Sequence, residues 1–147
     1  MAGIRLQSVK KIFKDADVIE RLDLSIRDGE FFTFVGPSGC GKSTLLNMIA
    51  GLESVTEGNI YFDDALVNDL SPKERDVAMV FQSYALYPHM TVYENIAFPL
   101  RMKKAADESV DKEVNRVVSL LGQAEMLNRK PKQISGGQRQ RVALGRA

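Results

Sequence analysis

A glycine-rich octapeptide carries the clearest chemistry in the sequence. Residues 36–43 read Gly-Pro-Ser-Gly-Cys-Gly-Lys-Ser and match the pattern G-x-x-x-x-G-K-[ST]. Glycines permit a tight loop whose backbone N–H groups turn toward phosphate oxygens, and a helix that follows adds the positive end of its dipole. We therefore expect Lys42 to reach the β- and γ-phosphates of a nucleotide and the Ser43 hydroxyl to complete the coordination of Mg²⁺.

A second stretch also suits an anion. Residues 134–138 read Ile-Ser-Gly-Gly-Gln, which places two glycines and short polar side chains at the start of a predicted helix. One nucleotide does not need two such helix ends from one small domain, so we expect a partner subunit to supply one of them. Head-to-tail pairing of two copies would use both.

The elements that position these stretches alternate between strand and helix in the first half of the chain. Short runs of β-branched and aromatic residues predict strands at residues 4–9, 31–35, 59–62 and 77–81. A helix is predicted from Lys42 to its stop at Gly51. This order favours an α/β fold with a largely parallel sheet.

The second half of the chain reads as helical. Thr91 with Glu94 forms a capping-box pattern that predicts the first helix, and Pro99 limits how far that helix continues regularly. Apolar residues at helical spacing predict a second helix over residues 107–121. A third helix is predicted to open at Ser135, where Gln138 completes another capping-box spacing.

Composition sets limits on the remaining possibilities. The chain has 147 residues, a net charge of +1 and one cysteine. These values predict a soluble globular domain without a disulfide, in a reducing compartment, and the near-neutral charge gives no reason to expect nucleic acid as a partner. The longest apolar stretch, residues 31–35, is far too short to cross a bilayer.

Taken together, these motifs make the sequence similar to the nucleotide-binding subunit of ABC transporters, from about Ile4 to Ala147, and most like the ATPases of carbohydrate importers. Residues 36–43 resemble the Walker A motif, and Gln82, after the predicted strand at residues 77–81, resembles the Q-loop glutamine. Residues 134–147 resemble the signature sequence and its helix, with Ile134 in place of the usual leucine.

The resemblance implies a fold, cofactors and roles for residues. The implied fold is a P-loop NTPase-type sheet with an antiparallel edge over about residues 1–90, and a helical subdomain over about residues 91–147, incomplete at the C-terminus. The implied cofactors are ATP and Mg²⁺, with Lys42 and Gln82 as catalytic residues and Ser43 and Gln82 at the metal. The nucleotide contacts implied are Phe13, stacking on adenine, and Gly36, Pro37, Ser38, Gly39, Cys40, Gly41, Lys42, Ser43, Thr44, Gln82, Ser135, Gly136, Gly137 and Gln138.

The resemblance also implies partners. The residues after Ile134 would contact ATP bound to a second ATP-binding subunit in a head-to-tail dimer. The segment from Ser83 to Met90 would contact the permease subunits, at the cytoplasmic face of the membrane. The implied function is to couple ATP binding and hydrolysis to import of a solute, a sugar on this resemblance.

The family also needs an apolar strand that ends in acidic residues, followed by a switch histidine, both beyond the signature helix. The sequence ends at Ala147 without them, so we expect the front part of a longer ATPase that does not sustain hydrolysis by itself. Two alternatives stay open: a truncated product that only binds nucleotide, and another P-loop enzyme, such as a kinase using Asp63 or Asp64. Those two acids follow an apolar run of three residues, for which a surface hairpin strand is favoured.

Overall fold

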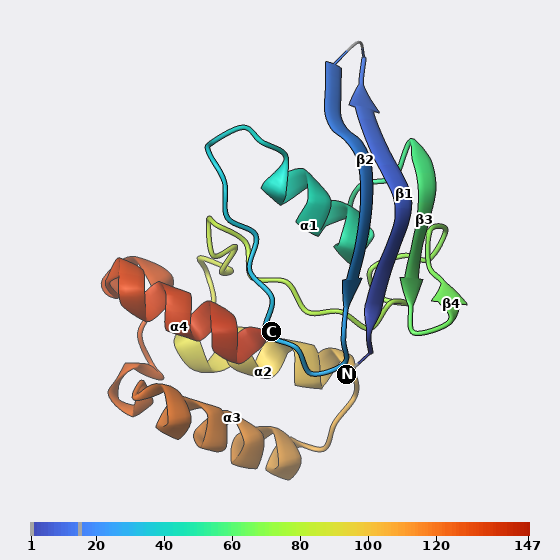
Figure 1. Ribbon diagram of the computed structural model, residues 1–147. Coiled ribbons are helices and arrows are strands. Elements are labelled where there is room, and N and C mark those ends of the chain that lie inside the picture. The colour runs from blue at the N-terminus through green and yellow to red at the C-terminus, as the bar shows by residue number, and fades with distance from the viewer. Residues whose placement is uncertain (1, 15) are drawn as a thin grey trace. The chain divides into compact units, whose positions relative to one another are not determined.

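The computed structural model describes residues 2–14 and 16–147, and it divides into two compact units (Figure 1). The first unit extends to Val77 and the second comprises Ala78–Ala147. The division falls before the boundary near residue 90 that was expected from the sequence. The phosphate-loop sequence belongs to the first unit, and Gln82 and the predicted signature residues belong to the second.

The first unit is built on a four-stranded antiparallel sheet in the order β2-β1-β3-β4. Its strands are β1 (Ile4–Phe13), β2 (Ala16–Ile26), β3 (Glu57–Phe62) and β4 (Ala65–Leu66). The strands expected at residues 4–9 and 59–62 are confirmed in longer form. β1 lies between β2 and β3 and pairs with both, so its apolar side chains Leu6 and Val9 form part of the core.

The predictions of strands at residues 31–35 and 77–81 are wrong, because neither run forms a strand in the described part of the chain. A strand exists only where a second backbone completes its hydrogen bonds, and every pairing in the described sheet is antiparallel. Phe31 is 95% exposed and Val35 is 91% exposed, so these apolar residues are not covered as parallel strands require. The mixed α/β class with a helical part is confirmed, but the sheet of this structure is not a parallel one.

The helix α1 (Lys42–Ala50) begins and ends where the sequence predicted. Leu45, Met48 and Ile49 pack against the sheet, where they join Leu6 and Ile60 in one apolar cluster. Gly51 ends the helix with φ 77°, a left-handed conformation that glycine adopts without strain.

A buried arginine fixes the C-terminal end of α1. Arg75 is 8% exposed, and its Nη1 donates to the carbonyls of Met48 at 2.7 Å and Ile49 at 2.9 Å. Its Nε donates to Leu70 O at 3.0 Å and its Nη2 to Asn68 O at 3.1 Å. A Cβ on Gly51 would lie 2.8 Å from Arg75 Nε, so glycine is required beside the guanidinium.

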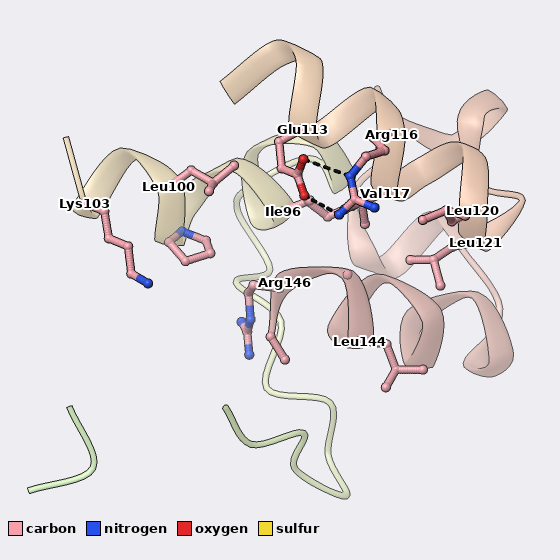
Figure 2. A pocket seen from close by; sticks show the side chains of 13 residues that line it. Ile96, Leu100, Lys103, Glu113, Arg116, Val117, Leu120, Leu121, Leu144 and Arg146 are labelled. Carbon is pink, nitrogen blue, oxygen red and sulfur yellow. Dashed lines mark hydrogen bonds and ion pairs between the residues drawn. The ribbon is translucent and has the colours of Figure 1, made fainter. Parts of the chain in front are cut away.

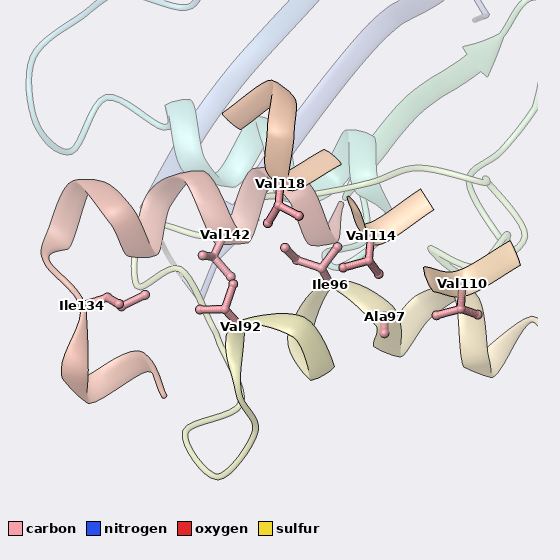
Figure 3. Close-up of a cluster of buried hydrophobic side chains, with 8 residues drawn as sticks. All are labelled: Val92, Ile96, Ala97, Val110, Val114, Val118, Ile134 and Val142. Atoms are coloured by element: carbon pink, nitrogen blue, oxygen red, sulfur yellow. The ribbon is translucent and has the colours of Figure 1, made fainter. Parts of the chain in front are cut away.

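The second unit contains three helices around its own core. They are α2 (Val92–Met102), α3 (Asp107–Leu121) and α4 (Gly136–Arg146), with short 3₁₀ turns η1 (Ala124–Met126) and η2 (Pro131–Gln133) between the last two. Figure 3 shows the buried cluster that joins the helices, which consists of Val92, Ile96, Ala97, Val110, Val114, Val118, Ile134 and Val142. All three helices start at the predicted positions, and α2 continues three residues past Pro99. Within the described chain, no helix combines the length and the apolar character that a bilayer span requires.

Candidate functional site

The loop at residues 36–43 leads directly into the first turn of α1. Gly39 and Gly41 have φ values of 83° and 90°, so both use the left-handed conformation that lets the backbone turn tightly. Gly41 is the N-cap and supplies no side chain to the helix, and the first turn contains no acidic residue. The N–H groups of residues 42–44 therefore have no partner inside the helix, and together with its dipole they favour an anion.

The ammonium of Lys42 lies within this loop. It donates to Gly36 O at 2.8 Å and to Pro37 O at 2.7 Å, and it lies 3.4 Å from Cys40 Sγ. Cys40 is a free, exposed cysteine, and Ser43 is exposed in the first turn of α1. The loop thus places a fixed positive charge, an exposed hydroxyl and bare N–H groups side by side.

The loop rests against β2. A Cβ on Gly41 would lie 3.0 Å from Val18 O and 3.3 Å from Ile19 Cγ1, so the backbone of the loop approaches this strand closely. Ile19 is the register partner of Lys11 on β1. Phe13, two residues further along β1, is 41% exposed at the end of that strand. The first unit therefore brings the phosphate loop and the predicted aromatic platform to the same end of the hairpin.

The start of α4 is the second helix N-terminus that exposes backbone N–H groups. Ser135 Oγ accepts from Gln138 N at 3.3 Å, and Gln138 Oε1 accepts from Ser135 N at 2.8 Å, which confirms the predicted capping box. The N–H groups of Gly136 and Gly137 are left without a helical partner. A Cβ on Gly137 would meet no atom within 4 Å, so packing inside the described chain does not demand this glycine. Its absence of a side chain keeps the backbone open to an approaching group.

Gln82 is exposed in a turn at the start of the second unit. The structure groups it with α4, whereas the phosphate loop and Phe13 lie in the first unit. The predicted site residues are thus distributed between two units, each of which presents one glycine-lined helix start.

Two residues that sequence reasoning missed hold the segment from Ser83 to Met90. Asn95 is fully buried in α2; its Oδ1 accepts from Tyr87 N at 2.9 Å, and its Nδ2 donates to Tyr87 O at 3.2 Å and Met90 O at 3.2 Å. At the end of α4, Arg146 Nη1 donates to Ala85 O at 2.6 Å, and its guanidinium lies 5.3 Å from the centroid of the Tyr87 ring. An asparagine on the apolar face of a predicted helix was the one available signal, because buried polar groups are nearly always hydrogen-bonded.

The acidic candidates form a turn. Asp63, with φ 50°, follows β3 and accepts from Gly3 N at 2.7 Å through Oδ1. β3 pairs with β4 across this turn, which confirms the hairpin interpretation of the run before Asp63 and Asp64. Nothing in this arrangement favours the kinase alternative. Among residues 2–14 and 16–147, no cluster of three or more His, Cys, Asp or Glu side chains is arranged to hold a metal ion.

A groove of about 390 Å³ lies between the helices of the second unit (Figure 2). Its apolar walls include Leu100, Leu121 and Leu144, and the ion pair of Glu113 and Arg116 lies at its edge. None of the residues expected to bind the nucleotide or the metal lines this groove. Its apolar walls do not suit phosphate, so the glycine-lined helix starts remain the candidate site.

Comparison with known proteins gives a consistent result. The family model described as "ABC transporter" matches residues 19–147. Among curated relatives, the trehalose/maltose import ATP-binding protein MalK of Thermococcus litoralis is 57% identical over 153 residues, covering 100% of this chain and 41% of the relative. The osmoprotective compounds uptake ATP-binding protein GgtA of Synechocystis is 56% identical over 147 residues, covering 100% of this chain and 40% of the relative. The chain therefore spans about two fifths of the length of these relatives.

A solved structure agrees with the sequence relatives. It is the ATP-binding cassette MJ0796, described as a dimer in a post-hydrolysis state bound to ADP and Pi. The match has a TM-score of 0.87 with 36% sequence identity, and it covers 97% of this chain and 68% of that one.

Proposed function

The chain belongs to the ABC transporter family, and on that premise we propose that it acts as the ATP-binding subunit of an importer. It would couple ATP binding and hydrolysis to uptake of a solute through a membrane permease. The observation that carries the proposal is the pair of glycine-lined helix starts, one at Gly41 and one at Gly136, in a single chain. Each offers bare N–H groups and the positive end of a helix dipole to phosphate oxygens.

The phosphate loop would hold the β- and γ-phosphates through the N–H groups of residues 42–44. Lys42, which donates to Gly36 O and Pro37 O in this structure, would exchange these contacts for contacts with phosphate oxygens. Charge-assisted hydrogen bonds of this kind are worth roughly 1.5–3 kcal/mol each. The residues 36–41 supply the cradle, and Thr44 continues the first turn.

The donor set of this chain fits Mg²⁺ bound mainly through phosphate. Mg²⁺ usually takes few protein ligands and keeps several waters, so a single hydroxyl beside the phosphates is an adequate protein contribution. Ser43 supplies that hydroxyl, exposed at the start of α1, and Gln82 supplies an exposed amide. When bound, the ion would neutralise charge on the phosphates, and Lys42 would hold their oxygens. The role of orienting the attacking water would fall to Gln82, as the family resemblance implies.

The start of α4 would act on the nucleotide held by a second copy. Phosphate oxygens on the partner's loop would meet the N–H groups of Gly136 and Gly137, with Ser135 and Gln138 at the edge of the contact. The absence of any neighbour near a Cβ on Gly137 supports a contact from outside the chain. The dimeric cassette to which this chain is similar offers further support. A head-to-tail dimer uses both helix starts of each chain.

The segment from Ser83 to Met90 would contact the permease, which places the subunit at the cytoplasmic face of the membrane. Asn95 and Arg146 hold this segment in a fixed conformation, with Tyr87 36% exposed. Similarity to the trehalose/maltose protein supports a carbohydrate as the solute.

The proposal is tested with two variants of the chain. Lys42→Met should weaken ATP binding measured by calorimetry by at least about 10-fold, from the loss of one charge-assisted contact. Gly137→Val should leave ATP binding by the single chain unchanged and abolish ATP-dependent dimerisation measured by light scattering. Equal ATP affinity in wild type and Lys42→Met would refute the phosphate loop, and undiminished dimerisation of Gly137→Val would refute the role of α4.

A further inference from the structure

A buried lysine lies beneath the exposed ring of Phe13. The side chain of Lys11 is 7% exposed, and its ammonium is 4.6 Å from the centroid of the Phe13 ring. This distance is within the range of a cation–π interaction, which is strongest where water is excluded. One face of the Phe13 ring is therefore occupied by a cation, although the residue as a whole is 41% exposed.

The lysine is held in place by the segment that follows α1. Lys11 Nζ donates to Glu53 Oε1 at 2.6 Å and to Ser54 O at 2.7 Å. A buried ammonium needs such partners, because an unpaired charge at this depth is costly. The position of the cation under the ring is thus set by α1 and its continuation, the same element that carries the phosphate loop at its other end.

The ring and the phosphate loop lie at nearby positions of the β1–β2 hairpin. Gly41 packs on Ile19, which is the register partner of Lys11. Phe13 lies two residues beyond Lys11, a rise of about 7 Å along the strand. The ring is therefore offset by these two residues, along the strand, from the position at which the loop packs.

The geometry points to Lys11 as a positioning residue for the nucleobase, acting through Phe13. The inference rests on the proposed function, because it concerns the base of the nucleotide that the phosphate loop would hold. The ammonium fixes the tilt of the ring and leaves one face for a flat aromatic ligand. A cation on one face also withdraws π density from the ring, which strengthens stacking of an electron-rich purine on the other face.

The test separates the base from the phosphates by using two probes, ATP and inorganic tripolyphosphate. Dissociation constants are measured by calorimetry for the wild type, Lys11→Met, Lys11→Arg and the matched control Lys10→Met. Lys10 is the neighbouring lysine and pairs with Asp17 at 3.5 Å across the hairpin. Lys11→Met should weaken ATP binding about 3-fold or more and leave tripolyphosphate binding unchanged, whereas Lys11→Arg and Lys10→Met should bind both probes like the wild type.

A double variant tests whether Lys11 acts through the ring. Phe13→Leu alone should weaken ATP binding by about 10-fold, because it removes the stacking surface. Adding Lys11→Met to Phe13→Leu should cause no further loss. An independent effect of Lys11→Met in the double variant would overturn the inference.

The remaining outcomes distinguish this inference from the proposed function. An unchanged ratio of ATP to tripolyphosphate affinity in Lys11→Met, or an equal loss for both probes, overturns the positioning role and leaves the phosphate loop intact. A wild type that binds neither probe refutes the proposed function itself, and the role of Lys11 with it.

Discussion

Replacement of Arg75 should destabilise the first unit more than replacement of any exposed arginine. Arg75→Met keeps the aliphatic stem but removes the donors to Met48 O and Ile49 O, both of which are buried. Met48 O still accepts from Gly51 N at 3.2 Å, so the cost arises mainly at Ile49 O. Leaving a buried carbonyl unsatisfied costs about 1–3 kcal/mol. Part of this loss in the free energy of unfolding is offset because the variant no longer buries a charged guanidinium. The cost of that burial is reflected in the pKa of Arg75, which desolvation lowers. We expect a net loss of about 2 kcal/mol, a large share of a typical stability of about 5–15 kcal/mol.

Urea unfolding followed by circular dichroism measures this loss. Arg27→Met is the matched control, since the Arg27 side chain is 89% exposed and its contact with Glu30 is 3.6 Å long. Exposed pairs contribute about 0–1 kcal/mol, so the control should remain close to the wild type. Arg75→Lys should fall between the two, because an ammonium cannot reach acceptors that the guanidinium spans. A loss below about 1 kcal/mol in Arg75→Met would show that these hydrogen bonds do not hold α1 in place.

Three further outcomes follow from contacts described above. Asn95→Ala should raise the amide exchange rate of the segment from Ser83 to Met90 at least about 10-fold, measured by mass spectrometry, and equal protection of the segment in both proteins would contradict the role of Asn95. The hydrogen bonds that Glu94 accepts from the backbone and hydroxyl of Thr91 hold the pKa of Glu94 below its usual value of 4.5, so the cap stabilises α2 fully at neutral pH and is lost as the pH falls below that value. The melting temperature of the wild type should therefore fall more steeply in acid than that of Glu94→Gln, and parallel curves would refute this. A bulky maleimide on Cys40 should abolish ATP binding, with Cys40→Ser as the unreactive control; normal ATP binding by the alkylated protein would show that the loop is not the cradle.

The helices were predictable because their signals are local. The capping boxes at Thr91 and Ser135 and the stop at Gly51 are each decided by residues within one turn, and all three are present in the structure. The strands were less predictable, because a strand forms only where a neighbouring strand completes its backbone hydrogen bonds, and that neighbour can be distant in the sequence. The run at residues 31–35 has strand-like composition but no partner in the described sheet. β2 was missed although Leu22, Leu24 and Ile26 alternate with polar residues, which is the period-2 pattern of a half-buried strand.

The same distinction applies to the candidate site. The phosphate loop is contained in eight consecutive residues, so its turn and its helix could be read directly. Lys11 and Arg75 could not, because their partners lie far away in the sequence: Lys11 contacts Glu53, 42 residues away, and Arg75 contacts Met48, 27 residues away. The role of a buried cation depends on the acceptors that surround it, and the folded structure is needed to identify these acceptors.

The helix α4 joins two surfaces of the second unit. Its first turn exposes Gly136 and Gly137, and its last turn holds Ala85 and Tyr87 through Arg146. An α-helix of 11 residues is a stiff rod about 16 Å long. A tilt imposed at the glycine end must therefore shift the arginine end, and the loop it holds moves with it. The number of residues in α4 therefore sets both the distance and the angle between its glycine end and Arg146. Inserting one residue would rotate Arg146 by about 100° around the helix axis and break its contact with Ala85.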